Sequence, residues 1–135
     1  LEPEVALVKT YPGIKREVLD FYIENYKGIV LEGTGLGHLP EGLFPPLEKA
    51  KKRGVPVVMT TQTIYGRVDM KVYATGRHLL ELGVIPGGDM LPETAYVKLM
   101  HVLGQTKKHE EIKKLMETDL AGELSEVSRP DTFLR

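Results

Sequence analysis

Apolar residues follow two alternating patterns along the chain, one of short unbroken runs and one of helical spacing. The unbroken runs occupy 5–8, 29–31 and 55–59, with a very short fourth run at 84–85. Runs of this kind are typical of strands that are buried on both faces. Apolar residues recur at helical spacing over 14–26, 40–53, 72–82, 92–103 and 108–117. The alternation predicts an α/β fold, a flavodoxin- or Rossmann-like three-layer sandwich around a small parallel sheet of about four strands.

Glycine and proline mark the expected ends of these helices. Glycine follows four of the helical patterns, at positions 28, 54, 83 and 104, and predicts that each helix ends there. Pro40 suits the start of the second helix, because a helix needs no N–H in its first turn. Pro45 and Pro46 are expected to delay or kink the first turns of that helix.

The chain reads as one domain, which we place at 1–120, followed by a C-terminal tail at 121–135. A length of 135 residues fits a single domain. The tail lacks periodicity, which is typical of a segment that is loosely held or reaches out to a partner. The chain opens with Leu1 and no initiator Met, just before the first expected strand. We therefore expect it to be a piece of a longer protein.

Composition argues against several classes of function. The 18 Lys and Arg residues and 19 Asp and Glu residues give a net charge of −1, unlike a domain whose main task is to grip nucleic-acid phosphates. The chain has no cysteine, which excludes disulfides, thiolate chemistry and cysteine-ligated zinc. No apolar run approaches the roughly 20 residues of a membrane helix. No signal peptide is visible, so we expect a cytoplasmic protein without membrane contact.

A glycine-rich loop is the first candidate for chemistry, because parallel sheets bind ligands where their strands end. The loop reads Gly33-Thr34-Gly35-Leu36-Gly37-His38, directly after the second strand. Its glycines let backbone N–H groups approach an anion or a neighbouring chain. The loop is not a dinucleotide fingerprint, since His38 stands where the third glycine belongs, and it is not a P-loop. A structural turn or an interface loop is the favoured interpretation, with a small-anion site as the alternative.

Polar side chains also follow the third strand, at Thr60, Thr61, Gln62 and Thr63. No base stands beside these threonines, so the favoured role of their hydroxyls is hydrogen bonding to the loop backbone. Thr61 and Gln62 are nevertheless candidates for contact with a ligand, because they lie at the strand-end edge.

The histidines and nucleophiles complete the list of candidates. His38 is a candidate for ligand contact because of its place in the glycine-rich loop, whereas His78, His101 and His109 are expected on the surface or on a helix face. No zinc pattern joins them, and no nucleophile motif is present. We therefore assign neither a catalytic residue nor a metal ligand to this chain.

Several segments together resemble the C-terminal domain of the L-asparaginase family. They are 31–37, 60–70, 73–77, 83–90, Glu93, 98–100 and 121–124. The resemblance covers nearly the whole chain. It implies a protein with two domains, whose nucleophilic threonine and second threonine with its Asp lie in an N-terminal domain. We find neither of those motifs here, so we expect the chain alone to be inactive.

The same resemblance gives two residues a role beside a neighbouring active site. In bacterial asparaginases an Asn ends the glycine-rich run and reaches the active site of a neighbouring subunit, and His38 stands at that position. Tyr73 matches a tyrosine that lies near the nucleophile in mammalian-type relatives; packing on the sheet is the equal alternative. The resemblance also implies a homodimer partner and an N-terminal asparaginase-type domain.

Within the family, the exact residues at 79–83 and 89–93 look most like those of the D subunits of archaeal glutamyl-tRNA(Gln) amidotransferases. That resemblance implies a glutaminase whose ammonia passes to an E subunit. The E subunit would bind the tRNA and use ATP and Mg²⁺, so that this chain needs no cofactor and meets tRNA only through the complex. Two alternatives stay open: the same domain of an archaeal L-asparaginase, or an independent flavodoxin-like module that binds a small anion.

Overall fold

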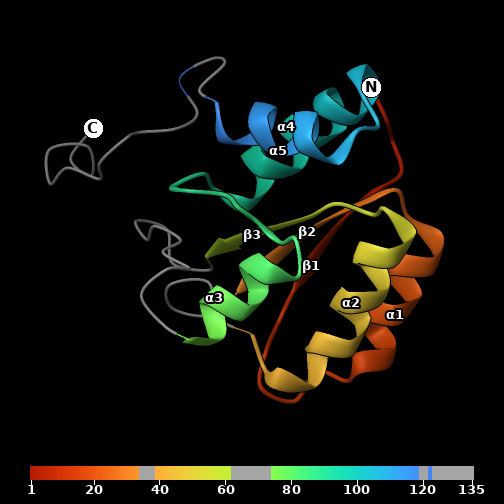
Figure 1. Ribbon diagram of the computed structural model, residues 1–135, viewed down its shortest axis with the longest axis vertical. Helices are drawn as coiled ribbons and strands as arrows, with labels where there is room; N and C mark the ends of the chain where they lie inside the picture. Colours follow the sequence, from red (N-terminus) through yellow and green to blue (C-terminus); the bar gives the residue numbers. More distant parts are fainter. Residues whose placement is uncertain (34–38, 62–73, 119–121, 123–135) are drawn as a thin grey trace, which may run out of the picture.

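Four parallel strands form the sheet at the centre of the molecule, which is seen here in a computed structural model (Figure 1). The structure describes residues 1–33, 39–61, 74–118 and 122. The strands are β1 (Val5–Lys9), β2 (Gly28–Gly33), β3 (Val57–Thr61) and β4 (Ile85–Pro86). They lie side by side in the order β1-β2-β3-β4, and every pair is parallel. The expected small parallel sheet is therefore confirmed.

Five helices cover the two faces of this sheet. They are α1 (Arg16–Asn25), α2 (Phe44–Arg53), α3 (Ala74–Glu81), α4 (Pro92–Gln105) and α5 (His109–Glu117). Figure 1 shows α1, α2 and α3 on one side of the strands and α4 with α5 on the other. The three-layer sandwich predicted from the sequence is thus the observed architecture.

The alternation of side chains along each strand divides the apolar residues between two cores. Residues that face α1, α2 and α3 are Ala6, Val8, Ile29, Leu31, Val57 and Met59. Residues that face α4 and α5 are Val5, Val30, Val58 and Ile85. Because both faces of the sheet are covered, its strands read as unbroken apolar runs and not as alternating ones.

The strand order explains why three consecutive helices share one face. Right-handed crossovers that step in a single direction place every connecting helix on the same side of the sheet. The order β1-β2-β3-β4 steps in one direction only. The second face is covered after β4, when the chain turns back as α4 and returns as α5.

Helix boundaries differ from the expectation at several proline or glycine positions. Gly28 does not cap α1, which ends at Asn25, and it is instead the first residue of β2. A short 3₁₀ turn (Glu41–Leu43) precedes α2, so the α-helix begins at Phe44 and holds Pro45 and Pro46 in its first turn, where their missing N–H groups cost nothing. Gly104 does not end α4, which runs on to Gln105. A Cβ at Gly104 would lie 3.4 Å from the Leu1 backbone, which is an ordinary van der Waals contact, so α4 passes through this glycine beside Leu1.

A buried lysine fastens α5 to α4. Lys98, on α4, is only 6% exposed, and its Nζ donates hydrogen bonds to the carbonyl oxygens of Met116 at 3.0 Å and Thr118 at 2.6 Å. A cation at the C-terminal end of a helix is favoured by the helix dipole. The end of α5 is therefore fixed by a charge from the neighbouring helix.

Two further expectations concern membrane-spanning helices and the C-terminal tail. None of the helices in the described part of the chain is long and apolar enough to cross a membrane. The expected boundary at 120 and the tail at 121–135 fall outside the described residues, except for Gly122.

Candidate functional site

Polar residues lie side by side at the carboxyl ends of the strands, which we call the strand-end edge of the sheet. In the strand register, Lys9 lies opposite Glu32, Glu32 opposite Thr60, and Gly33 opposite Thr61. Thr10 follows β1 directly and donates its backbone N–H to the Glu32 carbonyl oxygen at 3.1 Å. This strand-end edge is the place where the sequence pattern predicted a ligand contact.

Two threonines at the strand-end edge are almost completely buried. Thr10 is 1% exposed and Thr60 0% exposed. The Thr10 hydroxyl donates to the Glu32 carbonyl oxygen at 2.6 Å, and the Thr60 hydroxyl donates to the Leu31 carbonyl oxygen at 2.9 Å. Both hydroxyls are thereby satisfied, as buried polar groups must be. Thr60 bonds to the main chain as expected, but its acceptor lies in the neighbouring strand β2 and not in the loop.

The loop after β4 closes the same edge. The Gly87 N–H donates to the Met59 carbonyl oxygen at 2.8 Å. A Cβ at Gly87 would lie 2.7 Å from that oxygen and 3.1 Å from Cγ2 of Thr60, so only glycine fits here. The loop can therefore lie directly against the end of β3.

Sequence reasoning missed Thr10 and Gly87 as members of this edge. Thr10 stands two residues after the apolar run at 5–8, and so near a strand end, as Thr60 and Thr61 do. Gly87 begins a glycine pair two residues after the expected fourth run at 84–85. Position at a strand end would have found both residues, whereas a search for catalytic motifs passed over them.

The structure places two of the predicted site residues at the strand-end edge. Gly33 is the last residue of β2, and Thr61 is the last residue of β3, described by its backbone. The other predicted site residues lie outside the described ranges: Thr34, Gly35, Gly37, His38, Gln62 and Tyr73. Their roles stay predictions.

The three remaining histidines lie where the sequence placed them. His101 and His109 are exposed on α4 and α5. The exposed His78 on α3 meets the ring of Phe44 edge-on, with 4.6 Å between ring centroids. Among the described residues, no three His, Asp or Glu side chains are grouped in a way that could hold a metal ion.

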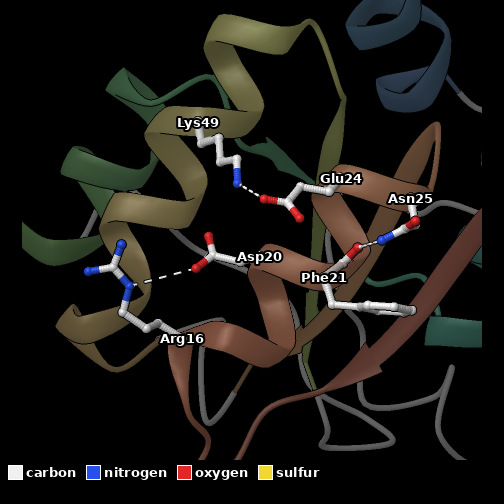
Figure 2. Close-up of polar contacts among 6 residues, drawn as sticks. All are labelled: Arg16, Asp20, Phe21, Glu24, Asn25 and Lys49. Carbon is white, nitrogen blue, oxygen red and sulfur yellow. Dashed lines mark hydrogen bonds and ion pairs between the residues drawn. The ribbon is translucent and has the colours of Figure 1, made fainter.

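Charge pairs with shifted pKa values lie away from the strand-end edge. Figure 2 shows one of them, between α1 and α2, where Lys49 donates a hydrogen bond to Glu24 and lowers the pKa of that carboxyl group. At the amino ends of the strands, the carboxylate of Glu2, assisted by Glu4, raises the pKa of Lys27. Apart from Glu2, whose side chain is only 13% exposed, these side chains are substantially exposed to solvent, and both groups of charges lie away from the strand-end edge.

Two hollows lie at the amino ends of the strands, opposite the strand-end edge. An open one of about 370 Å³ is lined by Arg53, Lys107 and the end of α1. A more enclosed and mostly apolar one of about 230 Å³ lies between α2, α3 and His109. Neither hollow contains a residue that the sequence pattern proposed for chemistry.

The fold, with its polar strand ends, can now be compared with those of known protein families. The family model of the Glutaminase/Asparaginase C-terminal domain matches residues 4–116, and the chain belongs to this family. The L-asparaginase of Thermococcus kodakarensis has the same fold, with a TM-score of 0.89 and 45% identity over 94% of this chain and 39% of its own. L-asparaginase I of Vibrio cholerae follows with a TM-score of 0.83 and 38% identity, over 93% of this chain and 38% of its own.

More similar relatives carry another name. The chain is 59% identical to the D subunit of the glutamyl-tRNA(Gln) amidotransferase of Pyrococcus abyssi, over 100% of this chain and 31% of that protein. It is 58% identical to the Methanopyrus kandleri protein of the same name, over 91% of this chain and 27% of that protein. The chain thus spans about a third of the length of the relatives it matches, and it is homologous to their asparaginase-like C-terminal domain.

Proposed function

We propose that this chain is the C-terminal domain of a glutaminase-type D subunit in an amidotransferase that converts Glu-tRNA(Gln) to Gln-tRNA(Gln). The observation that carries the proposal is the degree of sequence identity to two kinds of relative. The chain is 59% identical to a D subunit over its whole length, but 45% identical to the L-asparaginase with the same fold. A margin of this size over nearly the same residues favours the D subunit.

The proposed role of the domain is to complete an active site that another part of the protein provides. The described strand-end threonines Thr10 and Thr60 have their hydroxyls committed to carbonyl oxygens. They are therefore poorly suited to act as nucleophiles, which need an adjacent base. An N-terminal asparaginase-type domain would supply the catalytic threonines, and His38 and Tyr73 would approach the active site of a neighbouring subunit.

In the proposed assembly, the D and E subunits carry out different reactions. An E subunit would bind the tRNA and use ATP and Mg²⁺, while the D subunit releases ammonia from glutamine as a homodimer in the cytoplasm. A net charge of −1 supports a domain that leaves the tRNA to its partner. Within the described residues β1 pairs only with β2, and two large apolar side chains, Leu7 of β1 and Phe21 of α1, are 37% and 56% exposed. A free edge strand and exposed apolar side chains favour a domain that is covered in a larger assembly.

A domain exchange tests the proposal. The matching segment of the Pyrococcus abyssi D subunit is replaced by this chain, and the chimera is produced together with the E subunit of that organism. We expect ammonia release from glutamine and formation of Gln-tRNA(Gln), whereas this chain alone and the D subunit without the segment are inert. An inert but folded chimera, or ammonia release by this chain alone, would contradict the proposal.

An L-asparaginase is the second candidate, and the TM-score of 0.89 with the Thermococcus kodakarensis enzyme favours it. The discriminating measurement exchanges the same segment in that L-asparaginase and compares asparagine with glutamine as substrate. Full activity of the asparaginase chimera, together with loss of activity in the D-subunit chimera, would favour the second candidate.

A further inference from the structure

The last two carbonyl groups of β2 before Gly33 are each held by a threonine from a neighbouring strand. Thr60 of β3 holds the Leu31 carbonyl oxygen from one side. Thr10, beyond the end of β1, holds the Glu32 carbonyl oxygen from the other side, with both its hydroxyl and its backbone N–H. Successive carbonyls of a strand point in opposite directions, so the two threonines grip the end of β2 between them. We call Thr10 and Thr60 the threonine pair.

Burial gives the threonine pair little freedom. At 1% and 0% exposure, both threonines lie away from solvent. A buried donor that loses its partner costs more free energy than the hydrogen bond contributes, so the carbonyl oxygens are the favoured partners of both hydroxyls. Burial therefore favours the hold of the threonine pair on β2.

Packing fixes the orientation of Thr60 as well. Its methyl group lies so near Gly87 that a Cβ at that position would approach it to 3.1 Å. A β-branched side chain has few rotamers, and here the methyl group lies against the loop after β4 while the hydroxyl reaches β2. Thr60 thus links the ends of three neighbouring strands in one line of contact.

We propose that Thr10 and Thr60 are positioning residues. They fix the point and the direction in which the chain leaves β2 at Gly33, and the glycine-rich sequence proposed to reach a neighbouring active site begins at that residue. The proposal rests on the proposed function, because it assigns the threonine pair an effect on the release of ammonia. Neither threonine touches the substrate in this account; each acts through the main chain of β2.

The test uses the full-length protein with its partner subunit. Thr10→Val and Thr60→Val remove one hydroxyl each at nearly constant volume, and Thr10→Ser and Thr60→Ser keep the hydroxyl. Thr106→Val is the matched control, because it removes an exposed hydroxyl bond to Glu111 beyond the far end of α4. For each variant we would measure kcat and KM for glutamine, the midpoint of thermal unfolding, and hydrogen exchange of the peptide that spans β2.

Loss of one hydroxyl bond at the end of β2 is expected to lower kcat/KM about fivefold, the rate equivalent of one net hydrogen bond. Exchange at the end of β2 should rise in both valine variants, the serine variants should restore both readouts, and Thr106→Val should change neither. Unchanged hydrogen exchange of the β2 peptide in folded valine variants would show that the threonine pair does not hold the end of β2.

The readouts also separate this proposal from the proposed function. Faster exchange with an unchanged kcat/KM would overturn the positioning role while leaving the proposed function intact. If the unmodified full-length protein releases no ammonia, the proposed function fails, and the positioning role fails with it. In that case the exchange measurement still decides whether the threonine pair holds β2.

Discussion

The two ends of the sheet are held together by different chemistry. At the carboxyl ends of the strands, Thr10 and Thr60 make neutral, buried hydrogen bonds, and Gly87 packs directly on β3. At the amino ends, Lys27 lies 3.1 Å from Glu2 and 3.7 Å from Glu4, with its side chain 59% exposed. Buried neutral bonds fix positions, whereas exposed charge pairs are screened by water and salt.

This difference suggests which end can carry a precise function. A site needs groups that are held in place by packing and by hydrogen bonds from neighbouring residues. The strand-end edge meets that requirement, and it is also the edge from which the predicted site residues extend. Three changes test this contrast on the chain itself.

The largest effect is expected from Gly87→Ala. The new Cβ would lie 2.7 Å from the Met59 carbonyl oxygen, so backbone must shift, and overpacking of this kind costs roughly 3 kcal/mol. Gly13→Ala is the control, because a Cβ at Gly13 meets nothing within 4 Å. Urea unfolding of both variants measures the difference. Equal stability of the two would show that the strand-end edge is looser than its packing indicates.

A smaller loss is expected from Lys98→Met, which removes a buried cation from the end of α5. Two charge-assisted hydrogen bonds to Met116 and Thr118 disappear, and a stability loss of roughly 2 kcal/mol follows. Lys113→Met is the control, since Lys113 makes a half-exposed ion pair with Glu117. Thermal unfolding should separate them clearly. A control variant as unstable as Lys98→Met would remove the distinction between buried and exposed cations.

The smallest effect is expected from Glu24→Gln, and it should depend on pH and salt. Lys49 lowers the pKa of Glu24 below its ordinary value of 4.5, so the stabilisation exists above pH 4.5 and is lost as the pH falls through the lowered value. Unfolding curves on both sides of pH 4.5, at low and high salt, should show the variant differing from the original chain only at the higher pH and low salt.

The stabilisation from Lys27 depends on pH in the opposite direction to that from Glu24. Glu2 raises the pKa of Lys27 above 10.5, so this stabilisation is present below pH 10.5 and is lost as the pH rises through the raised value. The hydroxyl bonds of Thr10 and Thr60 have no such dependence. A Thr60→Val effect that varied with pH as the Glu24 effect does would contradict the division between the two ends.

Much of the fold could be predicted from residue patterns. The unbroken apolar run at 29–31 marked a strand buried on both faces, because helices cover both sides of a parallel sheet. The run at 5–8 also marked a strand, but its Leu7 is 37% exposed. Predictions of helix ends were less secure. Gly104 matched the signal for an end, but α4 continues through it to Gln105 and passes beside Leu1. A contact between residues about a hundred positions apart leaves no signal in the local sequence.

The candidate site shows the same division. Position at a strand end singled out Thr61, and the glycine-rich loop after a strand singled out Gly33; both residues lie at the carboxyl ends of their strands. The partners of Thr10 and Thr60 could not be predicted, because their acceptor carbonyls lie 22 and 29 residues away along the chain. The fit of Gly87 against Met59 likewise depends on how closely two strand ends approach.

The sequence by itself determined the α/β class, the parallel sheet and the place of the candidate edge, since periodicity and strand ends are local properties of the chain. Only the tertiary structure decided which face each helix covers, which carbonyls the buried threonines bind and where glycine is required. These depend on register and on distances between strands, which are set when the two cores pack against the sheet.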